Sequence, residues 1–146
     1  MKTPDETTAV REPVEGRTLH RYPEKMVVAR LAPGADVPEW AESASIMSIT
    51  ATAAETSIVC AGRSVPRKVP RHGPYTAFAV AGTLEPTLVG VLADLLQPLA
   101  EAGIPVMATS TYDTDWVLVP IDRADEAADA WRRRGHDVVV APVATP

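Results

Sequence analysis

Hydroxyl and carboxyl side chains are concentrated in residues 110–115, which read Ser-Thr-Tyr-Asp-Thr-Asp. The carboxylates of Asp113 and Asp115 can accept hydrogen bonds from an ammonium group, and the hydroxyls of Ser110 and Thr111 can donate or accept. No histidine follows nearby in the sequence to partner the two carboxylates. These groups therefore suit recognition of a small zwitterion more than they suit catalysis.

Several of these residues also have a purely structural interpretation. Asp113 is typical of a tight turn, because its short side chain can bond its own backbone. Asp115 can keep the edge of a strand charged and so oppose aggregation. Tyr112 either packs on the hairpin or covers a bound ligand. The sequence leaves these alternatives open.

A second group of candidate residues, Gly82, Thr83, Leu84 and Glu85, precedes a segment with helical periodicity. Gly82 lacks a Cβ, so a ligand can approach the backbone there. Thr83 offers a hydroxyl and Glu85 a carboxylate. The first N–H groups of the following helix would attract the carboxylate of a ligand. These groups are suited to holding a small polar ligand beside residues 110–115; the alternative is that the loop only starts the helix.

The strands that must position these groups follow from the apolar patterning. Residues 104–109 and 116–119 predict an antiparallel hairpin with the polar segment at its tip. Five further strands are predicted from short β-branched or alternating segments: residues 26–31, 46–50, 56–61, 75–81 and 137–141.

Helices are predicted at three places. A short helix is expected from Asp36, with Trp40 as its apolar anchor. Another is expected between Asp122 and Arg134, with acids near its start and arginines near its end. The longest is predicted over residues 86–102, where apolar residues recur with helical spacing. The apolar stripe consists of Leu88, Val91, Leu92, Leu95, Leu96 and Leu99.

The order of these elements indicates one unit used twice. The second half of the chain reads β-α-β-β-α-β, the ferredoxin-like order, whereas the first half reads β-α-β-β and then stops. Part of Thr18–Tyr22, just before the strand predicted over residues 26–31, is a candidate edge strand. The predicted division is a flexible N-terminal tail, a first abbreviated module, a basic proline-rich linker, a second module and a C-terminal tail: residues 1–22, 23–62, 63–73, 74–141 and 142–146.

Composition argues against several classes of protein. The chain has 146 residues, of which 46% are hydrophobic and 23% charged, as expected of a globular protein. Its net charge of -5 disfavours nucleic acid and anionic membranes as partners. Cys60 cannot form an internal disulfide, and His20, His72 and His136 are too scattered to suggest zinc. No apolar segment approaches the ~20 residues of a membrane helix. We expect a cytoplasmic protein without metal or cofactor.

The linker is the one strongly basic segment. Arg63, Arg67, Lys68 and Arg71 are interleaved there with prolines. These side chains are either solvated or receive an acidic protein partner. RNA binding is disfavoured, because Phe78 is the only phenylalanine and the overall charge is acidic.

Four separated motifs resemble those of the CASTOR-type ACT domain proteins. In order, they are residues 38–41, 57–60, 90–104 and 110–115. The resemblance covers about residues 24–141. It implies a tandem pair of ACT modules, which are small ferredoxin-like units with antiparallel sheets and helices on one face. It also implies an amino acid bound at an ACT–ACT interface, at the positions that match Gly82–Glu85 and Ser110–Asp115 here. The abbreviated first module departs from the pattern, which argues against a second, equivalent site.

The resulting expectation is a non-catalytic regulatory protein that binds an amino acid and forms a homodimer. The alternative is a structural or protein-interaction module with a vestigial pocket. An enzyme is disfavoured, because a nucleophile elbow, a phosphate-binding glycine loop and a dinucleotide-binding fingerprint are all missing from the sequence.

Overall fold

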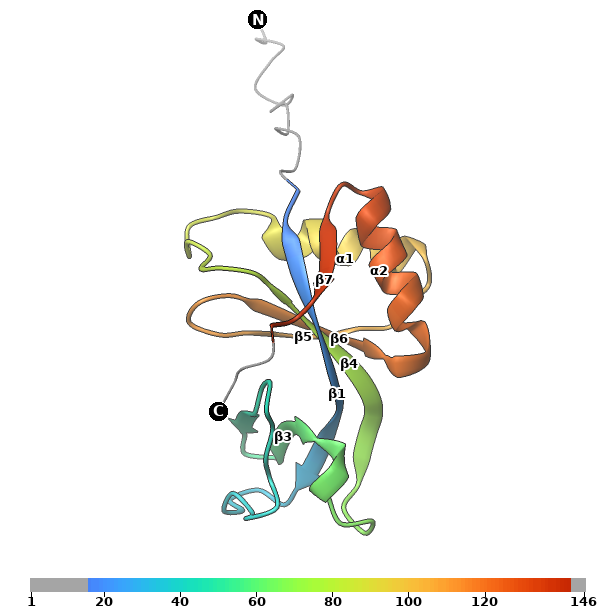
Figure 1. Ribbon diagram of the computed structural model, residues 1–146. Helices are drawn as coiled ribbons and strands as arrows, with labels where there is room; N and C mark the ends of the chain where they lie inside the picture. The colour runs from blue at the N-terminus through green and yellow to red at the C-terminus, as the bar shows by residue number, and fades with distance from the viewer. Residues whose placement is uncertain (1–15, 143–146) are drawn as a thin grey trace, which may run out of the picture.

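The longest strand, β1 (Thr18–Leu31), runs through the middle of a seven-stranded sheet (Figure 1). In the computed structural model, which describes residues 16–142, the strands pair in the order β2-β3-β1-β4-β6-β5, and β7 pairs with β1. All neighbouring strands are antiparallel except β1 and β7, which are parallel. The other strands are β2 (Ser48–Ala51), β3 (Thr56–Ala61), β4 (Arg71–Val80), β5 (Met107–Ser110), β6 (Asp115–Pro120) and β7 (Asp137–Val140).

β1 belongs to both halves of the sheet. Its first part, residues 18–21, lies between β7 and the end of β4. Its last part, residues 26–31, pairs with β3 on one edge, while the start of β4 occupies the other. The α+β class with a mostly antiparallel sheet is as predicted. The strands of the two expected modules form one sheet, because β1 lies between β4 and β7 and pairs with both.

Two helices, α1 (Val91–Glu101) and α2 (Ala124–Arg133), pack on one face of this sheet. Trp131 of α2 is fully buried and meets Phe78 edge to face, with the ring centroids 4.8 Å apart. Its indole N–H donates to the carbonyl oxygen of Leu95 over 2.8 Å. This bond holds α1 against α2. Within residues 16–142, no helix is long and apolar enough to cross a lipid bilayer.

The short helix predicted from Asp36 is absent, and residues 32–47 form a loop with turns. The reason lies in Glu24, whose side chain is only 10% exposed. Its carboxylate accepts the backbone N–H groups of Ala44 and Ser45 over 3.0 and 3.2 Å. In a helix these N–H groups would instead bond carbonyls one turn earlier. A side chain distant in the sequence therefore binds the N–H groups at the end of this segment in place of helical carbonyls.

Several predicted boundaries also move. Thr18–Tyr22, assigned mainly to the tail, are part of β1, because β4 and β7 pair with them. The predicted linker contains a short 3-10 helix, η1 (Gly62–Ser64), and its last residues already belong to β4. A second 3-10 helix, η2 (Ile121–Arg123), precedes α2. The remaining parts of the predicted tails, residues 1–15 and 143–146, lie outside the described residues.

Candidate functional site

The turn between β5 and β6 carries the polar segment singled out above. The N–H of Thr111 donates to the carbonyl oxygen of Thr114 over 2.8 Å, and the N–H of Thr114 donates to Thr111 Oγ1 over 3.3 Å. The Ser110 hydroxyl donates to Asp115 Oδ1 over 2.6 Å. The threonine side chain thus closes the turn, which leaves the exposed carboxylate of Asp113 available for other contacts.

The loop that follows β4 is attached to this turn by two hydrogen bonds. The N–H of Leu84 donates to the carbonyl oxygen of Asp113 over 2.7 Å. The Thr114 hydroxyl donates to the carbonyl oxygen of Val80, also over 2.7 Å. The bond from Thr114 holds the end of β4, and the bond from Leu84 holds the loop. The predicted site residues 82–85 and 110–115 therefore lie side by side.

The helix after this loop starts later than predicted, at Val91 instead of residue 86. Gly90 precedes it in the left-handed conformation, with φ of 86°, and such a residue cannot continue a right-handed helix toward the N-terminus. Leu88 was therefore wrongly included in the helical stripe, and it is 47% exposed. Its N–H instead closes a separate turn onto the carbonyl oxygen of Glu85 over 3.1 Å.

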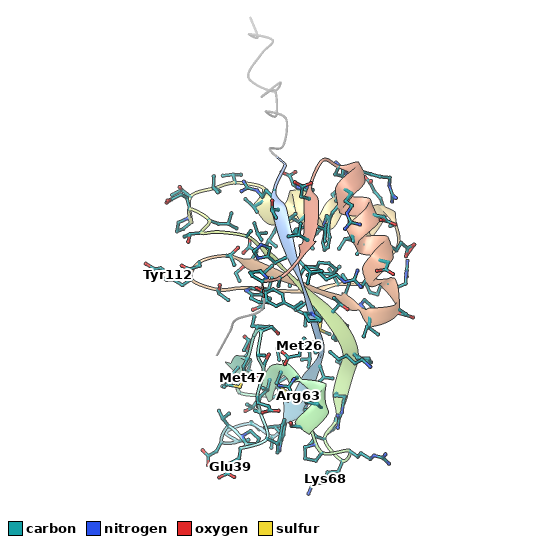
Figure 2. All side chains as sticks on the ribbon, in the orientation of Figure 1. Met26, Glu39, Met47, Arg63, Lys68 and Tyr112 are labelled. Carbon is teal, nitrogen blue, oxygen red and sulfur yellow. The ribbon has the colours of Figure 1, made fainter. Side chains whose placement is uncertain are left out.

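The turn, the loop and the start of α1 together enclose a pocket of about 480 Å³. Seven predicted site residues line it: Leu84, Glu85, Ser110, Thr111, Tyr112, Asp113 and Asp115. Gly82 and Thr83 do not line it. Gly82 has φ of 83° and serves the turn that ends β4. Tyr112 lies at the tip of the hairpin with its side chain 98% exposed, directed away from the sheet (Figure 2).

Sequence reasoning missed part of the lining. The additional residues are Pro86, Leu88, Gly90, Val91, Leu92, Ala93 and Thr114. Gly90 was the available signal, because a glycine inside an otherwise apolar periodic segment often marks a helix boundary. Thr114 also lines the pocket, although it was not among the predicted site residues.

The charged side chains that line the pocket are all acidic. Glu85, Asp113 and Asp115 line it, and its lining contains no lysine, arginine or histidine. The first backbone hydrogen bond of α1 runs from the N–H of Asp94 to Gly90, so the N–H groups of residues 91–93 have no carbonyl one turn earlier to bond. The pocket therefore combines acceptors suited to ammonium groups with the positive end of a helix dipole, which is suited to a carboxylate.

The β2–β3 hairpin repeats the turn of the β5–β6 hairpin. The N–H of Thr52 donates to the carbonyl oxygen of Glu55 over 2.9 Å, and the N–H of Glu55 donates to Thr52 Oγ1 over 3.1 Å. These bonds match those between Thr111 and Thr114, and they support the predicted repeat. The two residues between are alanines, at positions 53 and 54, so this copy lacks the phenol and carboxylate of the other.

Two segments of the chain match the sequence models of known families. The sequence model of the ACT domain family matches residues 73–133, which include most of β4, all of α1, and the β5–β6 hairpin. This segment is therefore similar to an ACT domain. A second family model, described as an N-terminal domain, matches residues 24–68. The pocket lies within the residues that match the ACT model, and β1 pairs with a strand of each matched segment, β3 and β4.

Solved structures agree with this assignment. Atu0741 from Agrobacterium tumefaciens is 28% identical, with a TM-score of 0.80 over 87% of this chain and 95% of that one. VC0802 from Vibrio cholerae is 15% identical, with a TM-score of 0.60 over 80% and 89%. The regulatory subunit of aspartate kinase from Thermus flavus is 12% identical, with a TM-score of 0.56 over 85% and 99%. No curated protein matches in sequence. The fold is therefore akin to that of aspartokinase regulatory subunits.

Proposed function

We propose that this chain is a non-catalytic regulatory protein that binds an amino acid in the pocket between α1 and the β5–β6 turn. The observation that carries the proposal is that one pocket contains both three carboxylates and the free N–H groups of a helix start. A zwitterion needs groups of both kinds. As in the CASTOR-type ACT proteins that the sequence resembles, the ligand would lie at an ACT–ACT interface of a homodimer.

The ligand's two ends have distinct places in this proposal. Its α-carboxylate accepts hydrogen bonds from the N–H groups at residues 91–93, where the helix dipole favours negative charge. Its α-ammonium group donates to Asp115, which is half-buried and already oriented by Ser110. Asp113 and Glu85 are exposed and belong to the rim. Serine paired with aspartate but without a histidine is a poor nucleophile, which supports binding over catalysis.

The charge of the pocket also favours a class of amino acid. Three carboxylates without a basic residue exceed what one α-ammonium group neutralises. An amino acid with a second cationic group in its side chain would compensate the excess. Leu84, Leu88 and Leu92 offer apolar surface for the aliphatic stem of such a side chain. Lysine, arginine and ornithine are therefore expected to bind more tightly than neutral amino acids.

Thermal unfolding in the presence of each amino acid tests this function. A ligand at 100 times its dissociation constant stabilises the folded state by about 2.7 kcal/mol, which shifts the melting temperature measurably. We expect a shift with basic amino acids and isothermal titration to give one site per chain. The absence of a shift with every amino acid at saturating concentration would contradict the proposal.

One observation favours an alternative, a protein-interaction module with a vestigial pocket. Val89 is 96% exposed and Tyr112 is 98% exposed, and both lie at the pocket's loops. Exposed apolar and aromatic side chains of this kind mark contact surfaces. The same thermal screen separates the two functions, because an interaction module responds to a protein partner and not to amino acids.

A further inference from the structure

The basic segment of the chain forms a defined turn. The N–H of Val69 donates to the carbonyl oxygen of Pro66 over 3.0 Å, so Arg67 and Lys68 are the two central residues of a β-turn. Both side chains are exposed, and neither has a carboxylate partner within residues 16–142. Figure 2 shows Lys68 at the end of the molecule away from Tyr112.

This turn is held in place from the inside. Val65 and Val69 flank it and are buried, with exposures of 7% and 9%. The guanidinium of Arg71 donates to the carbonyl oxygens of Pro66 and Val69, the latter over 3.2 Å. The two cations are therefore presented on a preorganised support, which reduces the entropy lost when they bind a partner.

The other two basic residues of the segment are already engaged. Arg71 uses its donors on the turn itself. Arg63 pairs with Glu24 and Glu42. Of the four residues predicted to receive an acidic partner, Arg67 and Lys68 alone remain available in the described part of the chain.

A complementary surface exists on the same protein. The rim of the ACT pocket carries the exposed carboxylates of Glu85 and Asp113, with no basic side chain among its lining residues. Neither carboxylate has a salt-bridge partner in residues 16–142. The exposed apolar side chains of Leu88 and Val89 lie in the same loop and can pack against the prolines of a turn. Figure 2 shows Tyr112, which lines the pocket, on one flank of the molecule and Lys68 at the lower end, so we place the contact between two chains.

We propose that the Pro66–Val69 turn of one copy docks on the rim of the ACT pocket of a second copy, where Arg67 and Lys68 face Glu85 and Asp113. A two-fold axis makes this contact twice per dimer, once in each direction. The partner's turn then closes the pocket above Asp115 and the start of α1. This inference rests on the homodimer of the proposed function and names its interface, but it does not depend on the ligand.

The contact is electrostatic at the surface, so its strength decreases as added salt screens the charges. Reversing the charges on one side places like charges together and weakens association by about 100-fold or more. Sedimentation velocity over a range of protein concentrations measures this association. We expect the wild-type chain to dimerise, and Arg67→Glu/Lys68→Glu and Glu85→Lys/Asp113→Lys each to be monomeric.

Mixing the two double variants provides the decisive measurement. The acidic turn of the first then faces the basic rim of the second, and the basic turn of the second faces the acidic rim of the first. We expect the mixture to form a heterodimer with near wild-type affinity. Arg133→Glu, at an exposed arginine on α2, is the matched control for Lys68→Glu and should leave the wild-type dimer intact.

Three results would overturn the proposal. A monomeric wild-type chain would remove both this interface and the homodimer of the proposed function. A dimer that survives both reversals would place the interface elsewhere while the homodimer stands. Two monomeric variants that stay monomeric on mixing would show that the two charged surfaces do not face each other. Circular dichroism of each variant tests whether it is folded, and only folded variants enter the comparison of association.

Discussion

The backbone N–H of Leu84 lies 2.7 Å from the carbonyl oxygen of Asp113 and donates a hydrogen bond to it. This bond joins the loop after β4 to the β5–β6 turn, and it uses main-chain atoms only. Side-chain substitutions around the pocket therefore leave the connection in place. For this reason the chemistry of the pocket can be changed without separating the two segments that form it.

Replacing Asp115 by asparagine tests the site directly. Asparagine keeps an acceptor for the Ser110 hydroxyl but removes the charge that would bind the ligand's ammonium group. Loss of a charged hydrogen bond should weaken ligand binding by about 10- to 100-fold in isothermal titration. Asp122→Asn, at an exposed acid before α2, is the control and should not change the affinity. Equal affinities for wild type and Asp115→Asn would place the ligand elsewhere.

Alanine substitutions at two leucines of the predicted stripe, Leu95 and Leu88, test which of them belongs to the buried face of α1. Leu95 is fully buried, whereas Leu88 is 47% exposed. Leu95→Ala should lower the free energy of unfolding by about 2–5 kcal/mol, because it leaves a cavity. Leu88→Ala should change it by less than about 0.5 kcal/mol. Urea denaturation monitored by tryptophan fluorescence measures both; similar losses would refute the assigned start of α1.

The carboxylate of Glu24 predicts a dependence of stability on pH. Burial by itself raises the pKa of Glu24, but hydrogen bonds from Ser43, Arg63, Ala44 and Ser45 outweigh it and lower the pKa from 4.5 to about 2. The folded state therefore binds fewer protons than the unfolded state between these values. The stabilisation, on the order of 3 kcal/mol, is fully present above pH 4.5 and is lost as the pH falls toward 2.

Urea denaturation at a series of acidic pH values measures this effect. In Glu24→Gln the loss of stability between pH 4.5 and 2 should be smaller than in the wild type. Glu39→Gln, at an exposed acid of the same loop, should retain the wild-type dependence. Parallel pH profiles for wild type and Glu24→Gln would contradict the role of the carboxylate.

His136 predicts a second dependence, nearer neutral pH. Its side chain is buried, and Nδ1 accepts the backbone N–H of Arg17 over 3.0 Å at the start of β1. Burial, with the charge of Arg17, lowers the pKa of His136 below 6.5. The unfolded state then binds more protons, so stability is fully present above pH 6.5 and decreases as the pH falls below it. NMR titration of the imidazole should show that His136 protonates below pH 6.5; a midpoint at or above pH 6.5 would contradict this.

Prediction from sequence succeeded where the structure follows local patterns. The β5–β6 hairpin is visible because apolar segments flank residues 110–115, and α1 is visible because Leu95 and Leu99 have helical spacing. It failed where distant groups compete with the local pattern. Residues 32–47 have a capping residue and an apolar anchor for a helix, yet Glu24 binds the N–H groups of Ala44 and Ser45 within them. Local propensity is weak enough for such contacts to override it.

The sequence alone determined the α+β class, the polar hairpin tip and the apolar face that α1 buries, because side-chain periodicity encodes each of these within a few turns or strand residues. The tertiary structure decided that β1 joins the whole sheet, that α1 begins after Gly90, and that the pocket takes Leu84 but not Thr83. The joined sheet and the lining of the pocket depend on hydrogen bonds between segments far apart in the chain, such as that from Leu84 to Asp113, and no local spacing specifies the partners of such bonds. The start of α1 depends on the left-handed backbone of Gly90.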